Sequence, residues 1–163
     1  MMGREDVMSV LRKDLTALGF AGRGRNLRVL REEVAWLVEL ELIPRTSRVG
    51  VFLGACPAVL APEGWPTRAN DCPIILDPAS GGAALLGHNR WVTWLALDGD
   101  SVLSDEARRE ALYRLAEALV SASERITTVS ELRAAAAEGQ LTGFVRKDAR
   151  ALLVGGETTN GGG

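Results

Sequence analysis

The sequence is poor in the side chains that most metal sites and nucleophilic sites require. It has two cysteines and one histidine among 163 residues, one ligand fewer than a closed tetrahedral zinc site needs. Cys56 and Cys72 are separated widely in the chain, outside any CxxC pair, and a nucleophilic cysteine would have to use His88 as its base. Nothing beside His88 in the sequence supports such a pair. We therefore expect no catalytic residues, no metal site and no cofactor, with two reduced thiols or, as the alternative, one bridge between them.

Long apolar runs and an excess of one charge are absent as well. No uninterrupted apolar stretch approaches the roughly 18 residues of a membrane span, and the first six residues lead into a charged, helix-like pattern that does not resemble a secretory signal. The net charge is −2, from 19 basic and 21 acidic side chains. No overall field then attracts nucleic acid or an anionic membrane. These features predict a cytoplasmic protein with neither kind of partner.

What the chain does contain is typical of a globular domain. Apolar residues make up 47% and charged residues 25% of the sequence, and the length suits one hydrophobic core. We predict a single domain over residues 1–154. Residues 155–163 contain five glycines and no apolar side chain, which favours a disordered tail.

Hydrophobic spacing predicts a helix first, then strands, then helices. The clearest strand is 34–43, where residues alternate between a face with Trp36 and a face with Glu39 and Glu41. Ser104 precedes two acidic residues and should cap the strongest helix, and Ser130 should cap a shorter one. The expected helices are 5–18, 104–125, 131–138 and 144–154; the expected strands are 27–30, 34–43, 49–53 and 91–97, with a flexible basic loop at 21–26.

Residues 57–90 form a long segment in which proline and glycine interrupt regular structure. Five of the six prolines lie here, and a long irregular stretch in a domain is usually a functional or a disordered loop. Trp65 and Arg68 lie on this loop and belong to the residue types enriched at protein-protein hot spots. An alternative role for Trp65 is to fasten the loop to the sheet.

A basic run before the first strands is the second candidate for a binding surface. Arg23, Arg25, Arg28 and Arg31 form a local run that no acidic residue interrupts before Glu32, and such a run can bind phosphate or an acidic partner. The glycines at 22 and 24 lead into a strand and so lack the context of a phosphate-binding loop. Since 17 of the 19 basic residues are arginine, the run has the alternative explanation that arginine is this chain's usual cation. Nucleic-acid binding would need a wider patch with aromatic residues interleaved.

Glu39 and Glu41 are the one pair of carboxylates expected on the same strand face. Their Cβ atoms should lie about 7 Å apart, a spacing that suits general acid-base chemistry or a hard metal ion. The alternative is a solvent-facing pair with cross-strand partners such as Arg28 or Arg48. We favour the alternative, because half of this face is apolar.

The order of these features resembles a known small bacterial family. It runs from the helix and Gly19-Phe20 through the basic glycine loop, the tryptophan strand, Val49-Gly50-Val51-Phe52-Leu53-Gly54, the Trp94 segment and the long helix to Thr128-Val129-Ser130-Glu131-Leu132. Over roughly residues 5–139 this pattern resembles the family catalogued as domain of unknown function 4304. The resemblance implies an α+β domain with an antiparallel sheet and brings no characterised active site.

Together these observations predict an α+β fold with a four-stranded antiparallel sheet. The N-terminal helix and the C-terminal helices pack on one face, and the other face is either partly open or covered by the 57–90 loop. The expected function is non-catalytic binding of another protein, as in immunity or adaptor proteins, through Trp65, Arg68, Arg23, Arg25 and Arg28. The alternative is a small enzyme or ligand-binding domain that uses Glu39, Glu41 and an arginine in a cleft.

Overall fold

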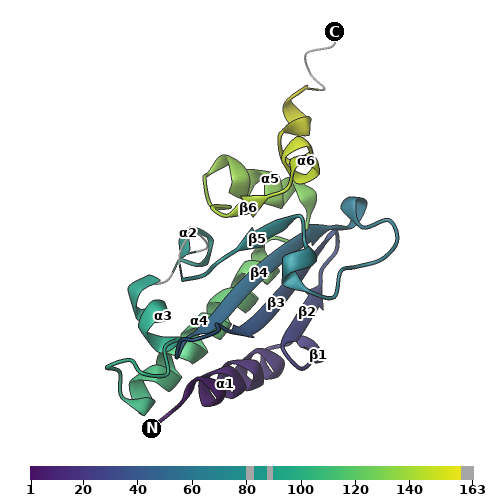
Figure 1. The fold of residues 1–163 in the computed structure, drawn as a ribbon. Helices are drawn as coiled ribbons and strands as arrows, with labels where there is room; N and C mark the ends of the chain where they lie inside the picture. Colours follow the sequence, from purple (N-terminus) through teal and green to yellow (C-terminus); the bar gives the residue numbers. More distant parts are fainter. Residues whose placement is uncertain (80–82, 88–89, 159–163) are drawn as a thin grey trace.

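The computed structural model describes residues 1–79, 83–87 and 90–158 and shows an α+β fold (Figure 1). An N-terminal helix is followed by a run of strands and then by helices. The strands are β1 (Ala21–Arg23), β2 (Asn26–Leu30), β3 (Val34–Leu42), β4 (Val49–Pro57), β5 (Ile74–Leu76) and β6 (Phe144–Val145). The helices are α1 (Arg4–Ala17), α2 (Ala83–Leu86), α3 (Arg90–Ala96), α4 (Asp105–Arg125), α5 (Val129–Ala137) and α6 (Lys147–Thr158), with 3-10 turns η1 (Ala58–Leu60) and η2 (Ala69–Asp71). Among the described residues no helix has both the length and the apolar character needed to cross a membrane.

The sheet has six strands in the order β1 to β6, and each pairs antiparallel with its neighbours. The prediction of four strands was therefore wrong in number. β1 lies where a flexible loop was expected at 21–26, β5 lies inside the 57–90 loop, and β6 lies at the start of the expected helix 144–154. These three strands have two or three residues each, too few for alternation to reveal them. The third expected strand is also longer, since β4 continues past Gly54 to Pro57.

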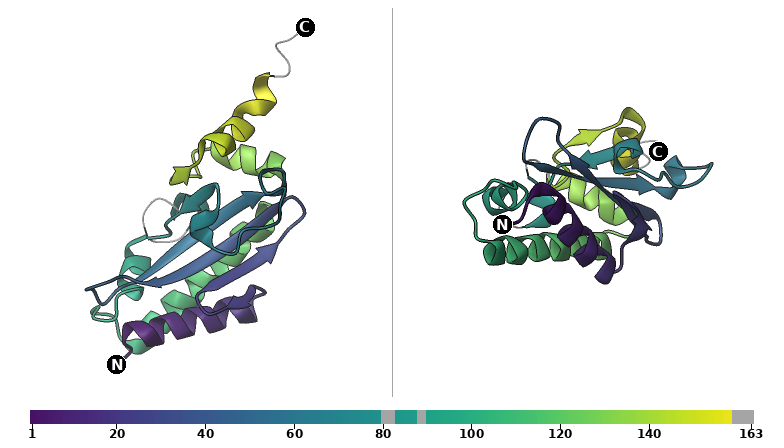
Figure 2. Two further views of the ribbon diagram at one scale, coloured as in Figure 1. Left: turned by 45° about the vertical axis from the view of Figure 1, so that its right-hand side comes forward. Right: turned by 60° about the horizontal axis from the view of Figure 1, so that its bottom comes forward.

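The inner face of the sheet carries the main hydrophobic core beneath α1 and α4. Val34, Trp36, Val38 and Leu40 of β3 are at most 1% exposed and join one cluster with the buried leucines of both helices. The indole Nε1 of Trp36 donates a hydrogen bond to the carbonyl oxygen of Ile126 at 2.8 Å. The right-hand view of Figure 2 shows α1 and α4 on the same side of the sheet. This part of the predicted architecture is confirmed.

Side-chain caps define where the later helices begin. Ser104 Oγ accepts a hydrogen bond from the Ala107 amide at 3.1 Å, as expected for the N-cap of α4. The next helix starts earlier than predicted, because Thr128 and not Ser130 is the N-cap of α5. α6 runs to Thr158, so residues 155–158 are helical and the prediction of a tail from residue 155 was wrong for them. Residues 159–163 lie outside the described residues.

The expected strand at 91–97 is the helix α3. Its buried positions Thr93, Ala96 and Leu97 follow helical spacing, whereas Trp91 and Trp94 are exposed. A short apolar segment satisfies strand alternation and helix periodicity equally, so the pattern alone does not separate them. β5 pairs only with residues 53–55 of β4, and the start of β4 is met by the residues that end the segment: the Val49 amide donates to the Leu97 carbonyl oxygen at 2.8 Å, and Arg48 and Asp98 form an isolated antiparallel bridge.

The outer face of the sheet is covered at its centre by residues 58–72, which we call the strap. Ala69 of η2 rests directly on Gly54 of β4, where an added Cβ would lie 2.8 Å from the Ala69 carbonyl oxygen and 2.6 Å from Cys72 Sγ. Ala35, Leu37, Cys56, Ala69 and Cys72 form a second buried cluster there. The expectation that the 57–90 segment covers part of this face is met by the strap.

Candidate functional site

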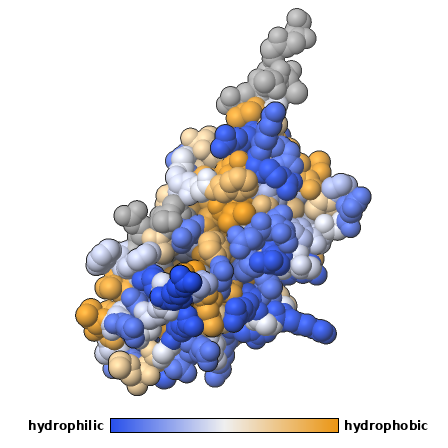
Figure 3. All heavy atoms as spheres, viewed as in Figure 1, coloured by the Kyte–Doolittle hydropathy of each residue, from blue (hydrophilic) through white to orange (hydrophobic). Residues whose placement is uncertain are grey.

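The uncovered part of the outer face lies over β1 and β2. In the register of the sheet Arg23 faces Asn26, and Arg28 faces both Ala21 on one side and Leu37 on the other. Because Leu37 belongs to the outer cluster, the residues in its row, Arg28 among them, lie on the outer face. Arg23, Arg25 and Arg28 are all exposed. In Figure 3 hydrophilic residues cover this area, while hydrophobic residues gather over β5 and β6.

The hairpin that presents these arginines is held by glycine and by α1. Gly24 has φ of +59° in the two-residue turn between Arg23 and Asn26, as the first central position of a type II′ turn requires. An added Cβ at Gly22 would lie 2.0 Å from the Asn26 carbonyl oxygen. Arg12 of α1 donates to the carbonyl oxygens of Gly24 at 2.6 Å and Gly22 at 3.2 Å. The turn is thereby tied to the helix.

Glu39 secures the strap to the sheet. Glu39 is 5% exposed. Its carboxylate accepts hydrogen bonds from Arg68 Nε at 2.6 Å and from the Asn70 backbone N–H at 3.2 Å. The Asn70 side-chain Nδ2 donates a further bond to it. The hydrogen bond and charge of Glu39 raise the pKa of Arg68 above its ordinary value. The predicted partners, Arg28 and Arg48, were wrong. Arg48 instead pairs with Asp98 at 3.6 Å.

This arrangement leaves Glu39 little capacity for acid-base chemistry. Both of its oxygens accept hydrogen bonds, whereas Glu41 on the same face is exposed. The sheet therefore does not bring the two carboxylates to a shared cleft. Among the described residues no group of three His, Cys, Asp or Glu side chains is placed to hold a metal ion.

A cleft of about 380 Å³ opens between the β1–β2 hairpin and the strap. Arg23 and Arg28 line it with Asn26 from the hairpin, and Thr67 lines it from the strap. The strap thus places Thr67, the neighbour of Arg68 in the chain, beside Arg23 and Arg28 of the hairpin. The sequence analysis missed Asn26 and Thr67. The turn glycine at 24 is the signal that could have placed Asn26 opposite Arg23.

The three arginines of the hairpin differ from most other arginines of the described chain in having no side-chain bond. In the described part of the protein most arginine side chains bind a carboxylate, a hydroxyl or a backbone carbonyl: Arg4, Arg12, Arg31, Arg48, Arg68, Arg108, Arg114, Arg125, Arg133 and Arg146. Within the same residues Arg23, Arg25 and Arg28 show no such side-chain bond and no ion pair. Their guanidinium donors are available to a ligand.

Trp65 and the cysteines belong to the packing under the strap. Trp65 is half-buried against the cluster that contains Ala35 and Leu37, which corresponds to its alternative role as a fastener of the loop. Cys56 and Cys72 are buried free thiols, and burial raises the pKa of both. His88, the one base considered for a cysteine nucleophile, lies outside the described residues.

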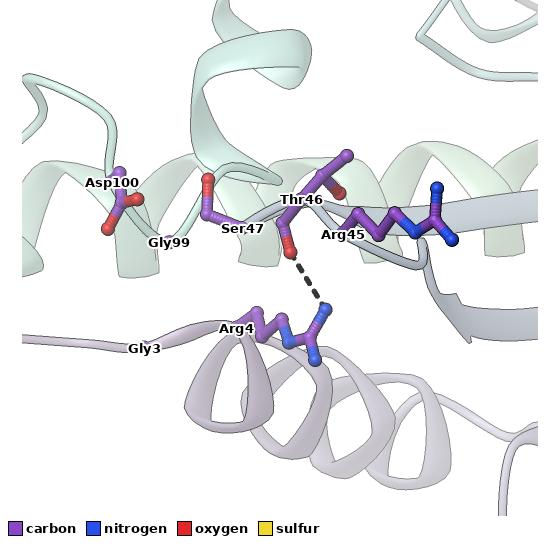
Figure 4. Close-up of a pocket in the computed structure, with 7 residues that line it drawn as sticks. All are labelled: Gly3, Arg4, Arg45, Thr46, Ser47, Gly99 and Asp100. Atoms are coloured by element: carbon purple, nitrogen blue, oxygen red, sulfur yellow. Dashed lines mark hydrogen bonds between the residues drawn. The ribbon is translucent and has the colours of Figure 1, made fainter.

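A second hollow is a structural junction. It measures about 530 Å³ and lies between the start of α1, the β3–β4 turn and residues 99–100. Arg4 donates from Nη1 to the carbonyl oxygens of Ile43 at 3.2 Å and Thr46 at 2.8 Å, and Figure 4 shows this guanidinium turned toward the turn. Arg45 extends away from Arg4 in the same view. Of the two arginines that line this hollow, Arg4 is thus already used to hold the turn.

From the sequence, Trp36, Trp91 and Trp94 each lie in an expected strand and are expected in the core, but the two tryptophans of α3 are exposed. Trp91 is 66% and Trp94 is 43% exposed, and the Arg48 guanidinium stacks 3.3 Å from the centre of the Trp94 ring. Trp36 is the one tryptophan of the three that matches the prediction. In the comparisons with known proteins, no family model, curated protein or solved structure matches the chain.

Proposed function

We propose that the protein is a non-catalytic protein-binding domain of the immunity or adaptor type. Its binding surface consists of Arg23, Arg25 and Arg28 on the hairpin and Arg68 on the strap, with Trp65 holding the strap in place. The observation that carries this proposal is that three exposed arginines without a side-chain partner among the described residues lie together on one hairpin, whereas most other arginines in the described part of the chain bind a carboxylate, a hydroxyl or a backbone carbonyl. Exposed guanidinium groups of this kind favour an acidic partner.

The charge distribution supports a protein partner over nucleic acid. The net charge of the chain is −2, and the basic surface is confined to one hairpin and one residue of the strap. A nucleic-acid site follows a longer phosphate backbone and usually has stacking aromatics beside the basic residues. From the resemblance to domain of unknown function 4304, we further propose a bacterial, cytoplasmic setting for this binding.

The enzyme hypothesis is not favoured by any specific contact. It requires Glu39 and Glu41 to act together in a cleft, and Glu39 is occupied by Arg68 and Asn70. The cleft beside the hairpin is lined by arginine, amide and hydroxyl groups. Those groups can bind an anion.

The decisive experiment compares two charge-reversed double variants. Arg23→Glu/Arg28→Glu reverses the candidate surface, and Arg109→Glu/Arg150→Glu makes the same change in charge at other exposed arginines. Proteins captured from a lysate of the source organism by the wild type are identified by mass spectrometry. Each is then purified and titrated calorimetrically against all three forms at two salt concentrations.

We expect a purified partner that binds the wild type and the control variant equally and the surface variant at least about tenfold more weakly, because like charges then face each other. Binding to the wild type should also weaken at the higher salt concentration. Equal binding by both double variants would remove the hairpin from the interface. Preferential capture of nucleic acid that is lost in the surface variant would contradict a protein partner.

A further inference from the structure

The cleft between the β1–β2 hairpin and Thr67 has the shape and chemistry of a site for one side chain. Its volume of about 380 Å³ is at the lower end of the range found for small-ligand sites. The outward-facing side chains of two short strands form its floor, and one residue of the strap forms a wall. Ala21 lines it opposite Arg28, so a methyl group leaves room beside the longer side chain.

The two arginines of the cleft are placed to meet on one anion. Arg23 of β1 faces Asn26 of β2, and Arg28 lies two residues after Asn26 in β2. The two arginines are therefore diagonal neighbours across the hairpin. Cβ atoms in that relation lie about 7–8 Å apart, within the reach of two arginine side chains. A guanidinium group binds a carboxylate through two parallel hydrogen bonds.

Asn26 adds a second requirement. Its Oδ1 atom is buried and has no hydrogen-bond partner within the described part of the chain. An unpaired buried acceptor destabilises the fold, and the terminal torsion of asparagine turns easily. A ligand that carries an N–H donor beside its carboxylate would satisfy this oxygen, whereas a simple dianion such as glutarate would not.

We propose that this cleft binds a glutamate or aspartate side chain of the partner protein together with a backbone N–H of the same segment. The proposal rests on the protein-binding function above and names the part of the partner that is recognised. Arg23 and Arg28 bind the carboxylate, and Asn26 accepts from the peptide N–H. Glu39 lies directly across from Asn26 in the sheet, and its ion pair with Arg68 at 2.6 Å balances its charge.

Titration of the ¹⁵N-labelled protein with three small probes tests this site without the natural partner. The probes are N-acetylglutamate N-methylamide, its glutamine counterpart and glutarate, and the readout is the set of backbone amide shifts. We expect saturable shifts confined to residues 21–28 and Thr67 with the glutamate probe. The glutamine probe should bind about tenfold more weakly, because a charge-assisted hydrogen bond is lost.

Point variants test the carboxylate contact and the peptide N–H contact separately. Arg28→Gln should weaken the glutamate probe about tenfold, whereas Arg150→Gln, an exposed arginine elsewhere, should leave it unchanged. Asn26→Ala should abolish the preference for the glutamate probe over glutarate. The amide spectrum of each variant shows directly whether it is folded.

Several results would overturn the site. Equal shifts with the glutamate and glutamine probes would show that the site does not distinguish a charged from a neutral side chain. Shifts centred outside residues 21–28 would place the bound anion elsewhere. A short single-stranded oligonucleotide that binds the same residues more tightly than the glutamate probe would assign the cleft to a phosphate backbone. If a purified partner loses binding in Arg23→Glu/Arg28→Glu while the glutamate probe leaves residues 21–28 unchanged, this proposal fails and the protein-binding function stands. The reverse pair of results supports a carboxylate site in the cleft but removes the hairpin from the interface with the partner, and this proposal then fails as well, because it assigns the carboxylate to that partner.

Discussion

Arginine performs two different tasks in this protein: some guanidinium groups bind another part of the chain, and others face solvent. Arg108 is fully buried and donates to the Met2 carbonyl oxygen at 2.6 Å and to Ser101 Oγ at 2.9 Å. Its neighbour Arg109 is exposed. The first joins the N-terminal segment to α4, and the second faces solvent on the same helix.

Replacing Arg108 should therefore destabilise the fold, while the same change one residue later should not. Arg108→Ala leaves the buried Met2 carbonyl oxygen without its donor and opens a cavity beside it. We expect the free energy of unfolding to fall by about 2–4 kcal/mol, measured by urea denaturation. Arg109→Ala is the matched control and should change it by less than about 0.5 kcal/mol. Equal effects of the two variants would show that the Met2 contact contributes nothing.

At the scale of elements, the strap is the part of the fold that depends most on a single side chain. Glu39 binds both Arg68 and Asn70, and the thiol of Cys72 lies beneath the same turn, close to Gly54. Thiol alkylation requires an accessible thiolate. The rate of Cys72 modification therefore reports how often the strap opens.

Glu39→Gln should increase the alkylation rate of Cys72 with iodoacetamide at least about tenfold, because the charged hydrogen bonds to the strap become neutral ones. Glu41→Gln on the same face is the control, since Glu41 is exposed. The reaction is followed by mass spectrometry at pH 8, where the raised pKa of Cys72 keeps the native rate low. If both variants react at the wild-type rate, the ion pair does not hold the strap.

Across the whole molecule, acid should destabilise the fold in a predictable range of pH. Several carboxyl groups have a pKa below its ordinary value: Asp98 through Ser47, Asp105 through the Met2 amide, Glu131 through the Thr127 amide and Asp148 through Arg146. For each, the stabilisation is present above the pKa of the unfolded chain, about 4. It is lost as the pH falls through the lower folded value.

We expect the melting temperature to be nearly constant from pH 7 to about pH 5 and to fall steadily below about pH 4. Asp98→Asn should lower the melting temperature at pH 7 and flatten the acid decline, because one of the contributing groups no longer titrates. Differential scanning calorimetry between pH 3 and pH 7 measures both effects. If the melting temperature declines as steeply in Asp98→Asn as in the wild type, the contacts of Asp98 with Ser47 and Arg48 do not contribute to the acid sensitivity.

The sequence predicted those elements that have a long, unambiguous period. α1 and α4 have apolar stripes of three or more turns and polar residues at their starts, and β3 alternates over nine residues. The 91–97 segment was mistaken for a strand because seven residues satisfy both periods. β5 and β6 are too short to have a period at all, and their pairing is decided by the partners that reach them.

The candidate site shows the same division. Local sequence identified the basic hairpin and the loop with Trp65 and Arg68, since both stand out by composition. Their proximity depends on η2 packing against Gly54 and on Glu39 binding Arg68, contacts between segments about 15 to 30 residues apart. No local pattern specifies which of 17 arginines meets a buried carboxylate.

The sequence by itself determined the helix and strand pattern of the core, because period and capping are properties of neighbouring residues. The tertiary structure decided which arginines are used up in the fold and which remain exposed beside the cleft. That choice depends on which segments meet in the fold: a guanidinium group that reaches carbonyl oxygens or a carboxylate donates to them, whereas one on the open hairpin has donors left to share.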